Sequence, residues 1–142
     1  TFPILKEIFS VKTDNLFDYI YESIKIITNY FEIKTNIVTS SSLNIDHDLK
    51  GANKVLGICN NLVADYYINP IGGIELYNKK EFLKEGVTLN FIKTDEIKYP
   101  QFKDEFVPNL SIIDVMMFNS KEEIKEMLIY YMAAQLKRAK NN

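Results

Sequence analysis

The feature that most constrains the fold is an alternation of β-branched segments with segments of helical period between residues 35 and 92. Residues 35–39, 64–68 and 87–92 favour strands because β-branched and aromatic residues dominate them. Apolar residues keep helical spacing from Ala52 to Val63, and a shorter helical segment precedes the third predicted strand. This order favours parallel strands joined by right-handed crossovers. We therefore predict an α/β fold with a parallel, doubly wound sheet and flanking helices.

The N-terminal region predicts one of the flanking helices. The first ten residues, with Pro3 among them, are expected to be irregular. Asp14 or Asn15 is placed to cap a helix over residues 16–31, where apolar residues recur at steps of three or four.

The C-terminal region predicts two more helices. Residues 110–118 are almost entirely apolar and predict a buried helix. Ser120 and Glu123 then form a capping box that begins a long C-terminal helix, which ends in a cluster of cations.

Composition narrows the class of protein. A chain of 142 residues is enough for one α/β domain over residues 1–142. The net charge of -2, with no basic stripe, argues against a nucleic-acid partner. No apolar run approaches the roughly 20 residues that span a bilayer, so we expect no membrane span. A single Cys59 and a single His47 provide no zinc spacing, so we expect no metal and no cofactor, in a cytoplasmic protein.

Ordered motifs in the second half of the chain point to a family. The first is NPIGG at residues 69–73, followed at one helical turn by a tyrosine. The second is YPQ at residues 99–101, followed by FVPNLSIID at residues 106–114. Together with the Ile-Cys pair at residues 58–59, these motifs resemble the WbqC-like protein family, most strongly over residues 56–118.

Two departures from the family pattern follow from the resemblance. Relatives usually open with a Met-Gln-Pro strand, an aromatic-rich Gly-Tyr-Phe turn and an Arg-Asn segment, none of which this chain contains. The resemblance therefore implies that the chain is the C-terminal portion of a longer family domain. Relatives also tend to have a glycine just before the second predicted strand, where this chain has Val63.

The resemblance also implies a function. The family is associated with bacterial O-antigen and polysaccharide gene clusters, and its members are often labelled aminoacyl or glycine transferases acting on amino sugars. This implies a group transferase whose small-molecule substrate is a nucleotide-linked or lipid-linked sugar. The alternative is a non-catalytic binding or subunit-interaction module, with the tyrosine-rich C-terminal helix as the contact of a homo-oligomer.

Two loops are candidate binding sites, because ligands of open parallel sheets bind at the carboxyl ends of strands. The serines after the first predicted strand offer hydroxyl groups, and the glycines of the NPIGG turn let backbone amides approach a ligand. The alternative is that the serines end a strand, the glycines make a turn and the following tyrosine packs in the core. The candidate substrate-binding residues of these loops are Ser41, Ser42, Asn69, Gly72, Gly73 and Tyr77.

Asp114 is the candidate catalytic residue, because it is a carboxylate inside an apolar segment and suits a general base. Ser111 shares its helix face, while Tyr99 and Gln101 lie in the preceding loop, and we predict that all three bind substrate. We also expect Asp114 to face a pocket. The structural alternatives are that Asp114 pairs with a cation or caps an amide, that Ser111 is an N-cap, and that Gln101 bridges loop backbone.

Overall fold

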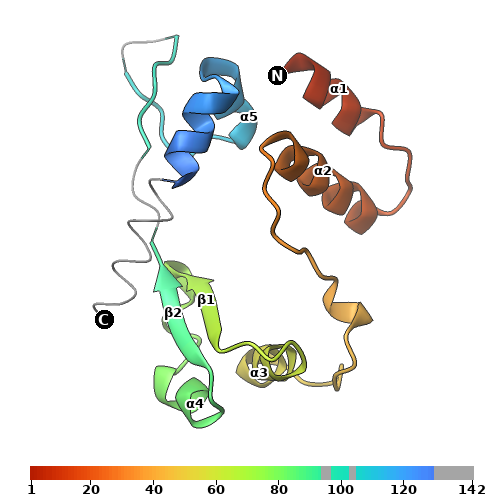
Figure 1. Ribbon diagram of the computed structural model, residues 1–142, viewed down its shortest axis with the longest axis vertical. Coiled ribbons are helices and arrows are strands. Elements are labelled where there is room, and N and C mark those ends of the chain that lie inside the picture. Colours follow the sequence, from red (N-terminus) through yellow and green to blue (C-terminus); the bar gives the residue numbers. More distant parts are fainter. Residues whose placement is uncertain (94–96, 103–104, 130–142) are drawn as a thin grey trace. The chain divides into compact units, whose positions relative to one another are not determined.

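The computed structural model of the chain describes residues 1–93, 97–102 and 105–129 (Figure 1). These residues belong to two compact units. The first unit contains residues 1–36 and the described part of 97–129, and the second contains residues 37–93. Each unit has a hydrophobic core of its own. Among the described helices, none combines the length and the apolar character that crossing a bilayer requires.

The first unit is helical, with α1 (Phe2–Phe9), α2 (Leu16–Tyr30), α5 (Ile112–Phe118) and a helical segment at residues 121–129. Asn15 caps α2 as predicted, because its side chain accepts a hydrogen bond of 2.9 Å from the backbone N–H of Phe17. The core residues of this unit are Phe31, Met116 and Ile124. Only the C-terminal end of the apolar stripe on α2 reaches this core, since Leu16 is 72% exposed.

Helix α1 corrects the expectation that the first ten residues are irregular. Pro3 lies in the first turn of α1, where a missing backbone N–H leaves no intrahelical hydrogen bond unmade. Ile8 is buried and Ile4 packs against the core of the first unit, so tertiary contacts select the helix.

The second unit contains a parallel pair of strands, β1 (Tyr66–Pro70) and β2 (Thr88–Ile92). Tyr67 lies opposite Leu89, which places both side chains on one face of the pair. Residues 35–39, predicted as a strand, pair with no strand in the described chain. The fold is therefore a mixture of helices with a small parallel sheet, and the predicted doubly wound sheet is not present among the described residues.

The core of the second unit lies between this pair of strands and the helices α3 (Gly51–Asn61) and α4 (Lys79–Lys84). Phe82 of α4 is fully buried and stacks on the ring of Tyr67 with 5.7 Å between the ring centroids. Tyr77 meets Phe82 edge to face at 5.8 Å. The opposite face of β1 carries the exposed side chains of Tyr66 and Ile68. One face of the sheet thus carries the core of this unit.

Three helices end in the same hydrogen-bonded turn, a Schellman motif with a left-handed residue after the C-cap. At the end of α3, the N–H of Ala64 donates to the carbonyl of Cys59 at 2.9 Å, and the N–H of Val63 donates to Asn60 at 3.2 Å. The left-handed residues of α2, α3 and α4 are Glu32 (φ 59°), Val63 (φ 52°) and Gly86 (φ 78°). Glycine adopts this conformation freely, whereas a β-branched valine is strained in it.

We expect Val63→Gly to stabilise the protein by about 0.5–1 kcal/mol, since relief of left-handed strain outweighs the entropy that glycine adds to the unfolded chain. Val63 is 85% exposed, so the replacement removes little buried surface. Chemical denaturation would measure the change. Val38→Gly is the control, because this half-exposed valine does not have a positive φ and its replacement should destabilise. Loss of stability in Val63→Gly would contradict the strain argument.

An ion-pair cluster joins α2 to the helical segment 121–129 within the first unit. Glu32 accepts a hydrogen bond of 2.7 Å from Lys121 and another from Lys125. The ammonium group of Lys121 also lies 5.3 Å from the centroid of the Tyr30 ring. The hydrogen bond from Lys121, followed by that from Lys125, lowers the pKa of Glu32 from 4.5 to about 2.

This lowered pKa predicts a dependence of stability on pH. The contribution of Glu32 should be fully present above its unfolded-state pKa and should be lost as pH falls from about 5 to about 2. The difference in unfolding free energy between the wild type and Glu32→Gln should therefore shrink over that range, and also in high salt. Replacing both Lys121 and Lys125 with methionine is the control background, in which Glu32→Gln should have little effect at any pH. A difference that stayed constant with pH would refute the assignment.

Candidate functional site

A loop and a helix of the first unit bring three of the predicted site residues together. The Tyr99 hydroxyl donates a hydrogen bond of 2.7 Å to Oδ2 of Asp114, which lies in the first turn of α5. The side-chain Nε2 of Gln101 donates to the same oxygen at 3.2 Å. Two neutral donors from one loop therefore converge on a single carboxylate oxygen.

Gln101 also fixes the loop that carries it. Its Oε1 accepts a hydrogen bond of 2.9 Å from the backbone N–H of Val107, and its Nε2 lies 3.2 Å from the Val107 carbonyl. The predicted loop-backbone bridge is therefore present, and Gln101 makes it while also donating to Asp114. This double use sets the orientation of the amide group.

Among the described residues, no lysine or arginine forms an ion pair with Asp114. Tyr99 is only 9% exposed, and burial followed by the hydrogen bond to Asp114 raises the pKa of its phenol. Tyr99 is consequently a neutral donor near neutral pH. Oδ1 of the half-buried Asp114 accepts no hydrogen bond from the part of the chain that the structure describes, and it is not sealed away from solvent. One carboxylate oxygen thus remains available to a ligand.

Ser111 has a structural role in this arrangement. Its Oγ accepts a hydrogen bond of 3.3 Å from the backbone N–H of Ile113, which makes it the N-cap of α5 as the structural alternative proposed. Asp114, three residues later, lies where an anion suits the helix dipole. Its carboxylate is nevertheless directed to the loop.

In the second unit, the predicted serines lie in the short helix η1 (Ser40–Ser42). Both Ser41 and Ser42 are exposed, and the hydroxyl of Ser42 donates a hydrogen bond of 2.7 Å to the carbonyl of Thr39. Because residues 35–39 form no strand, these serines do not lie at the carboxyl end of one. The predicted ligand site at the carboxyl end of a first strand is therefore not present, although Ser41 itself is exposed.

The NPIGG turn spans the end of β1 and the short helix η2 (Ile71–Gly73). A Cβ on Gly73 would lie 2.2 Å from Nδ2 of Asn69 and 3.4 Å from the ring of Tyr77. A side chain on Gly73 would therefore require the Asn69 amide to turn away from its present position. A Cβ on Gly72 would meet no atom within 4 Å, and Gly72 does not have a positive φ. No packing or conformational constraint in the described chain explains this second glycine.

Six of the predicted site residues thus fall into two groups. In the first unit Tyr99 and Gln101 both bond to Asp114, and in the second unit Asn69 and Tyr77 both lie beside Gly73. Sequence reasoning did not identify the aromatic rings that surround Tyr99. The ring of Phe106 lies 5.3 Å from it and that of Phe118 lies 6.4 Å from it. The aromatic residue within the FVPNLSIID motif was the available signal.

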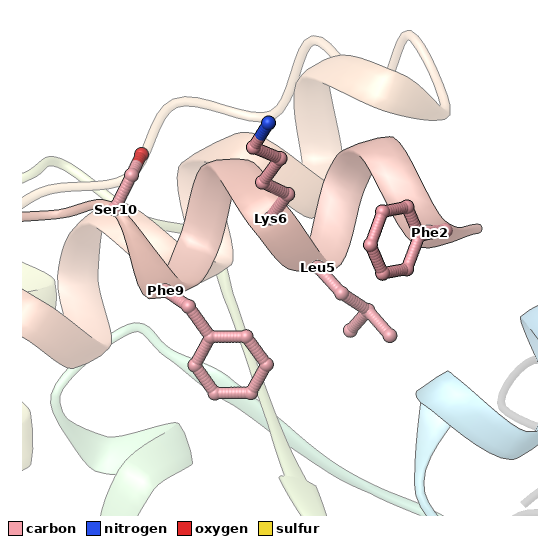
Figure 2. A pocket seen from close by; sticks show the side chains of 5 residues that line it. All are labelled: Phe2, Leu5, Lys6, Phe9 and Ser10. Carbon is pink, nitrogen blue, oxygen red and sulfur yellow. The ribbon is translucent and has the colours of Figure 1, made fainter.

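An open pocket follows one side of α1 (Figure 2). Its volume is about 430 Å³, and its lining residues are Phe2, Leu5, Lys6, Phe9 and Ser10. None of the predicted site residues lines it, so the expectation that Asp114 faces a pocket gains no support from it. In the described part of the chain, no three histidine, cysteine or carboxylate side chains gather as metal ligands would.

Comparison with known proteins identifies one family. A profile of the WbqC-like protein family matches residues 1–126. No curated protein and no solved structure matches the chain.

We expect Gly73→Ala to destabilise the protein by about 0.5–1.5 kcal/mol, because the new Cβ forces the Asn69 side chain out of its present rotamer. Gly72→Ala is the matched control and should be neutral or slightly stabilising, since its Cβ meets open space. Combining Gly73→Ala with Asn69→Ala should recover much of the loss. Urea denaturation of the four proteins would measure these differences, and equal effects at the two glycines would contradict the packing argument.

Proposed function

The chain belongs to the WbqC-like protein family, and from that premise we propose that it is a group transferase that acylates the amine of an amino sugar. We place this reaction in the cytoplasm, in the biosynthesis of bacterial surface polysaccharide. The observation that carries the proposal is the Asp114 carboxylate, which is held by two neutral donors and retains one oxygen without a partner in the described chain. Such an oxygen suits an N–H donor.

In the proposed reaction, Oδ1 of Asp114 accepts a hydrogen bond from the amine of the sugar and orients its lone pair toward an activated acyl ester. A bond forms between nitrogen and the acyl carbon, while the bond from that carbon to the leaving group of the donor breaks. Asp114 takes the proton that the nitrogen loses and returns it to the leaving group. General-base assistance of this kind contributes about 10²–10⁴-fold to a rate.

Tyr99 and Gln101 are positioning residues in this mechanism. Their hydrogen bonds to Oδ2 hold the plane of the carboxylate, and Gln101 is itself held by the backbone of Val107. A carboxylate fixed in this way loses little further conformational freedom when the substrate binds. Because both donors are neutral, neither competes with the substrate amine as an ion pair would.

For the second unit, taken by itself, we propose a separate ligand-binding role at the NPIGG turn and at η1. Gly72 supports this role, since neither packing nor backbone conformation requires a glycine there and its backbone is open to a ligand. The exposed hydroxyl of Ser41 is a further donor for a sugar or phosphate oxygen. The remaining predicted residues hold the local structure. Ser42 closes the η1 turn, Ser111 caps α5, and the NPIGG turn is shaped by Asn69, Gly73 and Tyr77.

The alternative function is a non-catalytic binding or subunit-interaction module. The observation that favours it is the apolar side of α1, where Phe2 is 76% exposed and Phe9 is 73% exposed beside the pocket of Figure 2. Large apolar side chains that gather on a surface are typical of contacts with other chains. We propose a homo-oligomer as one form of such a module. The tyrosine-rich C-terminal helix that was expected to form its contact lies outside the described residues beyond residue 129.

Thermal shift with paired ligands tests the enzyme proposal. One ligand is a nucleoside-diphosphate sugar with a free amine, and the other carries a hydroxyl group at that position. The amine-bearing ligand should stabilise the protein more than the hydroxyl-bearing ligand does. Relative to the ligand-free protein, its stabilisation should be about 2.7 kcal/mol at a concentration 100 times its dissociation constant. In Asp114→Asn the two ligands should become equivalent, while the amide oxygen can still accept the bonds from Tyr99 and Gln101.

The matched control for that experiment is Asp18→Asn. Asp18 occupies the same position in the first turn of α2 that Asp114 occupies in α5, so both variants lose the same helix-dipole interaction. Asp18→Asn should leave the preference for the amine intact. An equal preference in the wild type and in Asp114→Asn would reject Asp114 as the residue that binds the amine.

A further inference from the structure

Phe102 is an exposed aromatic residue beside the Asp114 cluster. Its side chain is 90% exposed, and its ring meets the ring of Phe118 edge to face with 4.6 Å between centroids. That contact gives the Phe102 ring a defined neighbour, while most of its surface is available to solvent. A large apolar ring in this position is a surface on which a ligand can pack.

The position of Phe102 is linked to that of Asp114 by two neighbouring contacts. Gln101 bonds to Asp114, and the next residue, Phe102, packs on Phe118, so the same loop touches α5 at two successive points. Asp114 and Phe118 are four residues apart on one helix and therefore lie on one face, with about 5–6 Å between their Cβ atoms. The two contacts that this loop makes with α5, at Asp114 and at Phe118, are therefore one helical turn apart.

We propose that Phe102 is a stacking platform for the sugar ring whose amine binds Asp114. The proposal rests on the proposed function and adds to it a substrate-binding residue. Carbon-bound hydrogens on one face of a sugar ring carry partial positive charge, which suits the negative face of an aromatic ring. In the proposed complex the face of the sugar ring packs on Phe102 while its amine reaches Oδ1 of Asp114.

The chemistry of the two groups together defines the ligand class. The carboxylate selects an N–H donor, and the aromatic ring selects an apolar face on the same molecule. A ring that carries a hydroxyl group in place of the amine keeps the stacking contact and loses the charge-assisted hydrogen bond. A free nucleobase can stack on the aromatic ring but has no amine for the carboxylate. The amino sugar should therefore bind more tightly than either the hydroxyl sugar or the nucleobase.

A tryptophan reporter tests the proposal directly, because the chain contains no natural tryptophan. In Phe102→Trp the indole becomes the sole tryptophan fluorophore, on a side chain whose exposure makes the replacement tolerable. The probes are glucosamine, glucose and uridine monophosphate. Glucosamine should change the fluorescence saturably, with an affinity at least about tenfold higher than that of glucose. Adding Asp114→Asn should remove this difference.

The matched control is Phe9→Trp, which places the same reporter on a phenylalanine that is 73% exposed on α1. It should not respond to glucosamine. An equal response at positions 9 and 102, or a response at position 102 to uridine monophosphate that matches that to glucosamine, would overturn the proposal.

Ligand-observed NMR with the wild-type protein, which needs no tryptophan reporter, tests the role of Phe102 separately from the proposed function of Asp114. Phe102→Ala should weaken glucosamine binding by about 3- to 10-fold, which is the range of one aromatic contact. Binding that depends on Asp114 but is unchanged by Phe102→Ala would overturn the role of Phe102 and leave the proposed function standing. Absence of glucosamine binding to the wild type would overturn both.

Discussion

Parallel pairing of β1 with β2 is the constraint on which the second unit depends. Two parallel strands cannot be joined by a tight turn, so the chain must cross over through residues 71–87 before it forms β2. Phe82 lies at the centre of this crossover, fully buried against the sheet. The Gly73 turn must bring Tyr77 back toward the same ring. The close packing at the NPIGG turn is therefore a consequence of the crossover.

The first unit depends on a different interaction, the convergence of Tyr99 and Gln101 on one oxygen of Asp114. Hydrogen bonds to a charged group contribute about 1.5–3 kcal/mol each, enough to hold an irregular loop against a short helix. The two hydrogen bonds occupy Oδ2 of Asp114, and in the proposed function Oδ1 binds the ligand. In the proposed function, stability and recognition share the Asp114 side chain, and Phe102 packs on Phe118 of the same helix.

The sequence predicted helix caps correctly where the residues that form a cap lie within four positions of one another. Asn15 caps α2, and Ser120 and Glu123 bond to each other in the predicted capping box. Such interactions depend on the chain itself, so the sequence contains them. The interpretation failed for residues 35–39, whose β-branched composition was sufficient for an extended chain but not for a sheet, because a strand also requires a partner.

By itself, the sequence determined the family and the N-terminal caps of α2 and of the helical segment 121–129, and it pointed to the polar residues that we propose for the site. Tertiary structure alone decided which of those residues meet. It placed Tyr99 and Gln101 on Asp114, 15 and 13 residues away, and kept the Gly73 turn within a separate unit. The physical reason is range, since caps and turns are closed by neighbours along the chain, whereas a binding site is assembled by the packing of distant segments.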